Sequence, residues 1–184
     1  MKSSYSENSF DLVFEAVAFS LNPQVIVEVG LLEGFSLQCM LKNVSKDCKV
    51  YGYDLFDDFP FNSAKKENLE IKFKHYKNLT LCKNEYKIVP FLHPNDTVDI
   101  FHVDIANNGE VFKYCVENYL PRLKKNGIMI LEGGSKERDE VDWMKEYKKT
   151  PINPYLESIK LRQDFIVLDK FPSLTIFKNE KAKR

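Results

Sequence analysis

The hydrophobic positions of the chain follow two spacings, one typical of helices and one typical of buried strands. In residues 9–22, apolar residues recur every three or four positions from Phe10 to Leu21, which predicts a helix with one apolar face. Pro23 ends this helix, because proline lacks the amide donor that a helix interior needs. Short runs of apolar, often β-branched residues then predict strands over residues 24–30, 48–56, 85–92, 97–105, 126–134, 164–171 and 173–178.

Helical spacing returns in segments between these strands. Apolar residues from Leu37 to Val44 share one face after the first strand, and the stretch 112–123 does the same after the fourth. A further helix is predicted within 57–84. A charged helix is predicted over 137–149, because its first turn is acidic and lysines gather near its end.

The order of these elements predicts the fold class. Five alternating strand and helix units favour a mostly parallel sheet with helices on both faces. The last two strands are separated by too few residues for a parallel return, so they form an antiparallel hairpin. The 184 residues fit a single domain, 1–184, with the helix of 1–22 at its start and a frayed basic tail at 178–184.

Composition argues against several classes of partner. Lys plus Arg and Asp plus Glu number 27 each, so no net field attracts nucleic acid or anionic lipid. No apolar run approaches the roughly 20 residues of a membrane span, and the polar start is unlike a secretion signal. The four cysteines contain no C-x-x-C pair, which indicates reduced thiols and argues against a zinc site. We expect a cytoplasmic protein without a membrane partner, and a homodimer stays open.

One stretch could suggest nucleic-acid binding. Residues 72–87 alternate lysines with aromatic and apolar side chains. A solvated helix or an edge strand has the same pattern without any need for a nucleic-acid partner. Little of the chain lies outside the predicted core, so no separate domain is left to recognise a macromolecule. A small-molecule acceptor is therefore favoured.

The stretch VIVEVGLLEGFS, residues 25–36, predicts a buried strand that stops at a glycine turn and continues as a helix. In a doubly wound sheet, ligands bind beyond the carboxyl ends of the strands, where the strand order switches beside the first strand. Gly30 and Gly34 would let a ligand lie close to the backbone there, while Glu28 or the turn amides meet its charged groups. The alternative is that both glycines only form a tight turn.

A second group of candidates follows the second predicted strand. Asp54 lies where an acidic side chain can accept both hydroxyls of a ribose, and Leu55 and Phe56 could pack on an adenine ring. Asp57 or Asp58 could be the ribose ligand instead, and all three acids could simply begin a solvated loop.

These motifs and the terminal hairpin make residues 9–178 resemble the class I methyltransferases that use S-adenosylmethionine. The resemblance implies a Rossmann-like sheet of seven strands in the order 3-2-1-4-5-7-6, with the seventh strand reversed. In that family, the loop written acidic-x-Gly-x-x-x-Gly-x-Ser binds the methionine moiety. The matching positions here are Glu28, Gly30, Gly34 and Ser36.

A nicotinamide dinucleotide fits the same loop less well. It requires G-x-G-x-x-G, whereas this chain places Glu33 where an anionic pyrophosphate would lie. An NAD(P)-dependent oxidoreductase is therefore the less favoured alternative.

Acidic residues also end the fourth and fifth predicted strands. The region resembles small-molecule O-methyltransferases, particularly the macrocin-type branch that modifies sugars, in which acids at these positions bind a divalent cation. Asp104 and Glu132 match, but Gly133 replaces the second acid of the usual pair. Mg²⁺ could still take these two carboxylates with a carbonyl of Asn107 or Asn108. Otherwise the two acids orient the substrate or accept its proton.

The favoured function is S-adenosylmethionine-dependent methylation of a hydroxyl on a small molecule such as a sugar or glycan precursor. The predicted catalytic residues are Asp104, Glu132 and His93, each able to accept the hydroxyl proton. His102 could serve too, or be an ordinary strand histidine, and Arg138 could contact an anionic substrate. The alternative is a catalytically silent module of the same fold that binds the nucleoside. Gly133, in place of the second acid, favours this alternative.

Overall fold

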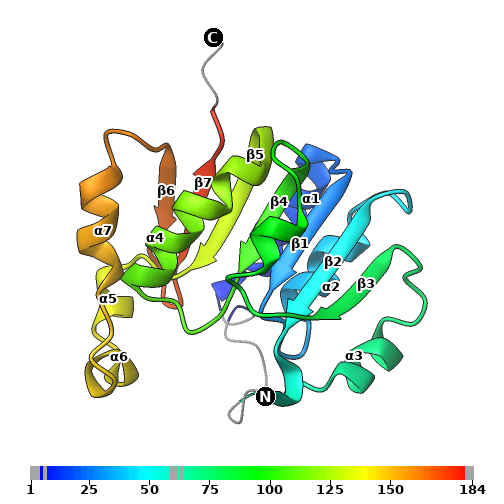
Figure 1. Cartoon of the computed structure of the whole chain (residues 1–184), viewed down its shortest axis with the longest axis horizontal. Helices are drawn as coiled ribbons and strands as arrows, with labels where there is room; N and C mark the ends of the chain where they lie inside the picture. The colour runs from blue at the N-terminus through cyan, green and yellow to red at the C-terminus, as the bar shows by residue number, and fades with distance from the viewer. Residues whose placement is uncertain (1–4, 6–7, 59–61, 63, 181–184) are drawn as a thin grey trace.

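The computed structural model describes residues 5, 8–58, 62 and 64–180. Its centre is a seven-stranded sheet in the order β3-β2-β1-β4-β5-β7-β6 (Figure 1). The strands are β1 Val25–Val29, β2 Lys49–Asp54, β3 Leu79–Lys83, β4 Val98–Val103, β5 Leu123–Glu132, β6 Phe165–Leu168 and β7 Leu174–Lys178. The predicted order is confirmed.

The directions of the strands are also as predicted. Parallel pairing joins β3 to β2, β2 to β1, β1 to β4 and β4 to β5. β7 runs antiparallel to both β5 and β6, so it is the reversed strand of the terminal hairpin. β1 therefore lies in the middle of the parallel part, between β2 and β4.

Helices cover both faces of the sheet. Figure 1 shows α4 in front of the sheet and α1 and α2 behind it. The α-helices are α1 Asp11–Leu21, α2 Phe35–Lys42, α3 Lys66–Lys72, α4 Gly109–Asn118, α5 Lys136–Asp139, α6 Asp142–Glu146 and α7 Ile152–Ile159, and the short 3₁₀ helices are η2 Phe56–Asp58, η3 Val89–Leu92 and η4 Leu120–Arg122. Within the described ranges, no helix is long and apolar enough to cross a membrane.

Successive residues of each strand point to opposite faces, so the sheet has two cores. Ile26 and Ile100 belong to the core under α1, α2 and α3. Val27 and Phe101, their neighbours in sequence, belong to the core under α4 and α7. Strands buried on both faces have continuous apolar sequences, which is why β1 and β4 could be predicted from sequence.

The prediction of a strand over 85–92 is wrong. This segment forms a turn and the 3₁₀ helix η3, and Pro90 lies in the first turn of η3. Proline fits there because it fixes φ and has no amide to donate, whereas an inner strand needs that donor. The third strand is β3, inside the lysine-bearing stretch 72–87. β3 is the edge of the sheet and only partly buried, so the exposed Thr80 and Lys83 are interspersed among its apolar residues.

The single helix predicted over 137–149 is also wrong in detail. Two short helices, α5 and α6, replace it, and the extended conformation of Val141 separates them. The structure adds α7, which was not predicted; its Ile152, Leu156 and Ile159 pack into the α4 core.

Candidate functional site

A cavity of about 490 Å³ opens at the carboxyl ends of the central parallel strands. Its walls are the turn after β1, the residues after β2 and β3, and the loop between β4 and α4. β1 continues into α2 on one face of the sheet and β4 continues into α4 on the other. The cavity therefore lies at the switch point of the strand order, where ligands of doubly wound sheets bind.

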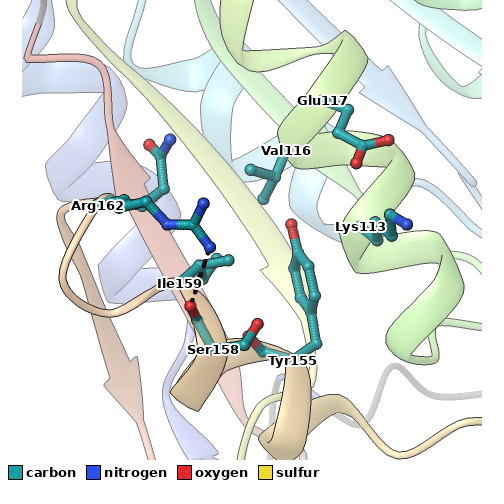
Figure 2. Close-up of a pocket in the computed structure, with 8 residues that line it drawn as sticks. Lys113, Val116, Glu117, Tyr155, Ser158, Ile159 and Arg162 are labelled. Carbon is teal, nitrogen blue, oxygen red and sulfur yellow. Dashed lines mark hydrogen bonds between the residues drawn. The ribbon is translucent and has the colours of Figure 1, made fainter.

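A second hollow lies on the outer side of the molecule. It has a volume of about 390 Å³ and lies between α4 and α7, where Figure 2 shows Tyr155 and Arg162 facing Lys113 and Glu117. Arg162, in the turn after α7, donates from Nη2 to the carbonyl of Ser158 in α7. No strand end contributes to this hollow, so the cavity beside β1 is the better candidate.

Asp54 forms a fixed wall of the cavity. Its Oδ2 accepts the amide of Leu31 at 2.7 Å, and its Oδ1 accepts the amide of Phe56 at 2.8 Å and the Asn62 side chain at 2.5 Å. The residue is 7% exposed. A carboxylate offers about four acceptor positions, so Asp54 keeps room for about one further hydrogen bond.

The residues after Asp54 divide between the cavity and the rest of the molecule. Leu55 lines the cavity, where its side chain offers an apolar surface. Phe56 does not line it, because it is buried in the core with α1 and α2. Asp57 and Asp58 are exposed and form ion pairs with lysines, and neither lines the cavity.

The two glycines of the β1–α2 turn are required by the protein's own packing. Gly30 has a φ of 84°, and a Cβ there would lie 1.8 Å from the carbonyl oxygen of Asp104. Gly34 has a φ of 72°, and its Cβ would lie 2.6 Å from the ring of Phe73. Both values of φ are in the region that favours glycine. Gly30 also lines the cavity, whereas Gly34 does not.

Glu28 and Ser36 meet each other instead of the cavity. The Ser36 hydroxyl donates to Oε1 of Glu28, and the same oxygen lies 3.1 Å from Nδ1 of His102. Glu28 and His102 are fully buried. These contacts tie β1 to α2 and β4, so the acid and the serine stabilise the β1–α2 turn.

Asp104 follows β4 and reaches the cavity. Its amide donates to the carbonyl of Val29 at 2.8 Å, which fixes the end of β4 against β1. Burial raises the pKa of the Asp104 carboxyl, while nearby His102 and a hydrogen bond with Tyr5 lower it. Asp104 is one of the residues that line the cavity, and it is therefore the candidate proton acceptor there.

Glu132 ends β5 and forms an ion pair with Arg138 of α5. Arg138 Nε donates to Oε1 at 2.5 Å and Nη2 donates to Oε2 at 2.8 Å, so both carboxylate oxygens are occupied. Burial raises the pKa of Glu132 to about 7, against the opposing effect of the guanidinium. Neither residue lines the cavity.

The structure does not bring His93 to the cavity. Its Nε2 lies 3.2 Å from the Tyr53 hydroxyl, and its ring packs against Tyr51 and Phe101. His93 is only 8% exposed, and its burial lowers its pKa. His93 therefore has the position of a core histidine on the face of the sheet that α4 covers.

Several cavity residues were missed by sequence reasoning. They are Asn62, Asn84, Tyr86, Glu110 and Lys149. Asn84 and Tyr86 directly follow β3, so a correct assignment of the third strand would have placed them at this edge. Lys149 comes from the segment before α7, and no spacing in the sequence indicates that it returns to the cavity.

A family model described as a methyltransferase domain matches residues 27–132, more than half of the chain. The match runs from β1 to the end of β5 and so includes Gly30, Asp54 and Asp104. No curated protein sequence gives a significant match.

Solved structures of methyltransferases share the fold. A methyltransferase of Geobacter sulfurreducens is 15% identical, with a TM-score of 0.66 over 94% of this chain and 79% of its own. A methyltransferase of Podospora anserina, solved with S-adenosylhomocysteine, is 15% identical, with a TM-score of 0.66 over 98% of this chain and 80% of its own. An O-methyltransferase of Streptomyces achromogenes, described as involved in tomaymycin synthesis, is 13% identical, with a TM-score of 0.65 over 98% and 82%.

At these identities the structural likeness establishes the fold alone. The family match is independent of it, and it covers the strand ends that build the cavity. The enzyme class expected from the sequence is therefore confirmed at the level of the family. The chain belongs to the methyltransferase-domain family.

Proposed function

We propose that this protein transfers the methyl group of S-adenosylmethionine to a hydroxyl oxygen of a small molecule. The observation that carries the proposal is Asp54, a nearly buried carboxylate fixed on the wall of a cavity at the switch point of the sheet. Its remaining acceptor position suits a ribose hydroxyl. Two solved neighbours of the same fold contain S-adenosylmethionine or its demethylated product.

The other walls suit the remaining parts of this nucleoside. Leu55 offers an apolar contact for the adenine ring beside the ribose. The β1–α2 turn lies next to Asp104, whose carboxylate complements the positive charges of the ammonium and the sulfonium. Glu28 and Ser36 act indirectly, because their hydrogen bond holds the turn that would contact the amino-acid end.

A divalent cation does not fit the residues present. Both oxygens of Glu132 already accept hydrogen bonds from Arg138, and Gly133 offers no side chain. In the part of the chain that the structure describes, no three His, Cys, Asp or Glu side chains are grouped to hold a metal. The suggested Mg²⁺ site at Asp104 and Glu132 therefore has no place in the proposed reaction.

The protein's part in methyl transfer is positioning and proton removal. When bound, S-adenosylmethionine would supply a methyl group on a sulfonium: as the acceptor oxygen bonds to the methyl carbon, the carbon–sulfur bond breaks and its electron pair stays on sulfur, which leaves neutral S-adenosylhomocysteine. The cavity holds the acceptor hydroxyl in line with that bond. Asp104 accepts the hydroxyl proton, and its raised pKa brings its basicity closer to that required at neutral pH.

The size of the cavity favours a small acceptor. Its volume of about 490 Å³ lies in the range of small-molecule sites. The charged residues that line the cavity are Asp54, Asp104, Glu110 and Lys149, so acids outnumber the single lysine and the local field does not favour a polyanion. Sugars and glycan precursors, the substrates of the macrocin-type branch, are the first acceptors to test. A cytoplasmic location and a homodimer stay predictions.

The second candidate is a silent nucleoside-binding module. The ion pair of Glu132 with Arg138 and the glycine at 133 favour it, because they remove the cation-binding acids of the metal-dependent enzymes that the region resembles. Both candidates predict the same cofactor in the cavity and differ only in turnover.

Isothermal titration calorimetry of the purified chain with S-adenosylmethionine, S-adenosylhomocysteine and NADH tests the cofactor. We expect both sulfur nucleosides to bind and NADH to bind more weakly. Failure of both to bind, or tighter binding of NADH, would overturn the proposal. A transfer assay with radiolabelled methyl donor follows, with sugars, phenols and RNA as separate acceptors. Binding without transfer would support the silent module, and transfer to RNA alone would refute the small-molecule acceptor.

A further inference from the structure

Three acidic residues lie at the carboxyl ends of adjacent strands: Glu28 and Glu132 are buried, and Asp104 is half-buried beside the cavity. Glu28 is on β1, Asp104 follows β4 and Glu132 ends β5. Each of the three lies within electrostatic reach of others in the group, because Glu28 raises the pKa of Asp104 and Asp104 raises that of Glu132. A cluster of like charges away from water is unfavourable unless a cation compensates it.

Arg138 supplies such a cation from within the chain. Its planar guanidinium meets Glu132 with two parallel hydrogen bonds, an arrangement that a single-point cation such as lysine does not reproduce. The side chain is 5% exposed, so this pair is much less screened than a surface ion pair.

Further contacts hold the guanidinium in place. Nη2 also donates to the carbonyl of Asn107 at 3.3 Å, and the Trp143 ring lies 4.8 Å from the guanidinium carbon. The Asn107 side chain donates in turn to the carbonyls of Val103 and Glu132, which ties the end of β4 to the end of β5. α5 begins at the Ser135 cap, whose hydroxyl accepts the amide of Arg138. The position of Arg138 is thus fixed by several independent contacts.

The guanidinium retains a donor after these contacts are made. Nη1 of Arg138 is buried and has no hydrogen-bond partner among the described residues, and the same is true of Oδ1 of Asn107. A bound metal ion commonly keeps a coordination position for a non-protein oxygen. Nη1 of Arg138 is buried and Arg138 does not line the cavity, so the likeness to a metal ion lies in charge compensation at Glu132 and not in contact with a substrate.

We infer that Arg138 takes the place of a divalent cation at Glu132, so that the protein does not bind a catalytic metal there and its methyl transfer is independent of metal. The statement about the reaction rests on the proposed function. The statement about Glu132 does not, because cation binding can be measured without turnover. Arg138 is a positioning residue in this view: it neutralises Glu132 and holds the ends of β4 and β5 beside Asp104.

Binding of Mn²⁺ alone, followed by electron paramagnetic resonance, tests the inference on the full chain after removal of metals with EDTA. The proteins compared are the wild type, R138A, R138K, the double variant E132Q/R138A and the control K136A, which changes an exposed residue of the same helix. We expect no specific binding by the wild type, K136A or R138K. R138A should gain affinity of at least about tenfold over the wild type, because a buried positive charge no longer opposes the ion. The double variant should lose that gain.

Two results would overturn the inference. One is stoichiometric binding of Mn²⁺ by the wild type that is weakened by E132Q. The other is a folded R138A, verified by circular dichroism, that gains no affinity for Mn²⁺. If R138A does not fold, Mn²⁺ binding by the wild type alone decides whether Glu132 is paired with Arg138 or binds a metal ion.

A separate assay addresses the reaction. Transfer by the wild type should proceed at the same rate in EDTA and in Mg²⁺, and loss of activity in EDTA that Mg²⁺ restores would overturn metal independence. A chain that binds no sulfur nucleoside would refute the proposed function, while the Mn²⁺ measurements on Arg138 and Glu132 would keep their meaning.

Discussion

The amide of Leu31 donates to Oδ2 of Asp54 at 2.7 Å, and this hydrogen bond joins the turn after β1 to the end of β2. The two residues form adjacent walls of the cavity. Asp54 therefore shapes the site in two ways: it positions the turn and it presents an acceptor oxygen. Changes at Asp54 should affect cofactor binding and stability together.

We expect D54N to weaken binding of S-adenosylhomocysteine by about tenfold or more, since an amide has one acceptor oxygen where the carboxylate has two. The variant should also lose about 1–3 kcal/mol of stability, because one of the amides of Leu31 and Phe56 is left without its partner. Calorimetry and urea unfolding measure the two effects.

The matched control is D57N, which alters an exposed acid three positions further along the chain. D57N should leave both the affinity for S-adenosylhomocysteine and the free energy of unfolding unchanged. Equal effects of D54N and D57N would contradict the assignment of the cofactor contact to Asp54.

G30A should destabilise the protein more than G34A. A methyl group at Gly30 meets backbone atoms of Asp104, which cannot move without disrupting β4, whereas at Gly34 it meets the end of the Phe73 ring. Both substitutions also place alanine at a positive φ, a cost of about 1–3 kcal/mol each. Urea unfolding of the two variants gives the comparison, and an equal or smaller loss for G30A would contradict the packing described at the end of β1.

D104N tests the proton acceptor. Once an acceptor molecule is known, we expect kcat to fall by about 10²-fold or more, the usual contribution of general base catalysis. Asparagine keeps the size of the side chain but removes the charge that complements the ammonium, so binding of S-adenosylhomocysteine should weaken as well, by a smaller factor than kcat. The control is D47N, which changes an exposed acid at the opposite end of the sheet. A D104N variant with normal kcat would remove Asp104 from the mechanism.

The rate of the wild type should also depend on pH in a defined direction. Asp104 accepts a proton only when ionised, and burial raises its pKa. The rate should therefore rise with pH through a midpoint above the ordinary value for an aspartate, about 3.9. A pH profile of kcat that shows no such rise would contradict the role of Asp104.

The buried His93 should make the free energy of unfolding depend on pH. Burial lowers its pKa, so near pH 6 the unfolded chain binds more protons than the folded protein. Its contribution is present above the unfolded pKa of about 6.5 and is lost as the pH falls through the lower folded value. Urea unfolding of the wild type and H93Q across this range should show a smaller acid-side loss for the variant. Parallel curves for the two proteins would show that His93 does not contribute.

The sequence predicted the centre of the fold better than its edges. β1 and β4 are buried on both faces, so Ile26, Val27, Ile100 and Phe101 are all apolar and the strands are unmistakable. β3 lies at the edge and mixes Thr80 and Lys83 with apolar residues, a pattern that matches several kinds of element equally well. The pattern therefore favours the more apolar stretch 85–92 for this strand.

The candidate site shows the same division. Asp54, Leu55 and Gly30 could be predicted to line the cavity because their place depends only on the ends of β1 and β2. Glu28 and Ser36 have the expected spacing, but their mutual hydrogen bond removes them from the cavity, and no spacing reveals which way a side chain turns. The bidentate pairing of Arg138 with Glu132 depends on how α5 folds back, which only the tertiary structure shows.

The contact of Arg138 with the ring of Trp143 gives the protein a built-in optical reporter. Trp143 is the chain's single tryptophan, so its fluorescence carries no background from another indole. Any event that shifts the guanidinium, whether occupancy of the neighbouring cleft or uptake of a competing ion, should change the emission of this one fluorophore. Ligand screening could then proceed on the unlabelled protein before an acceptor has been identified.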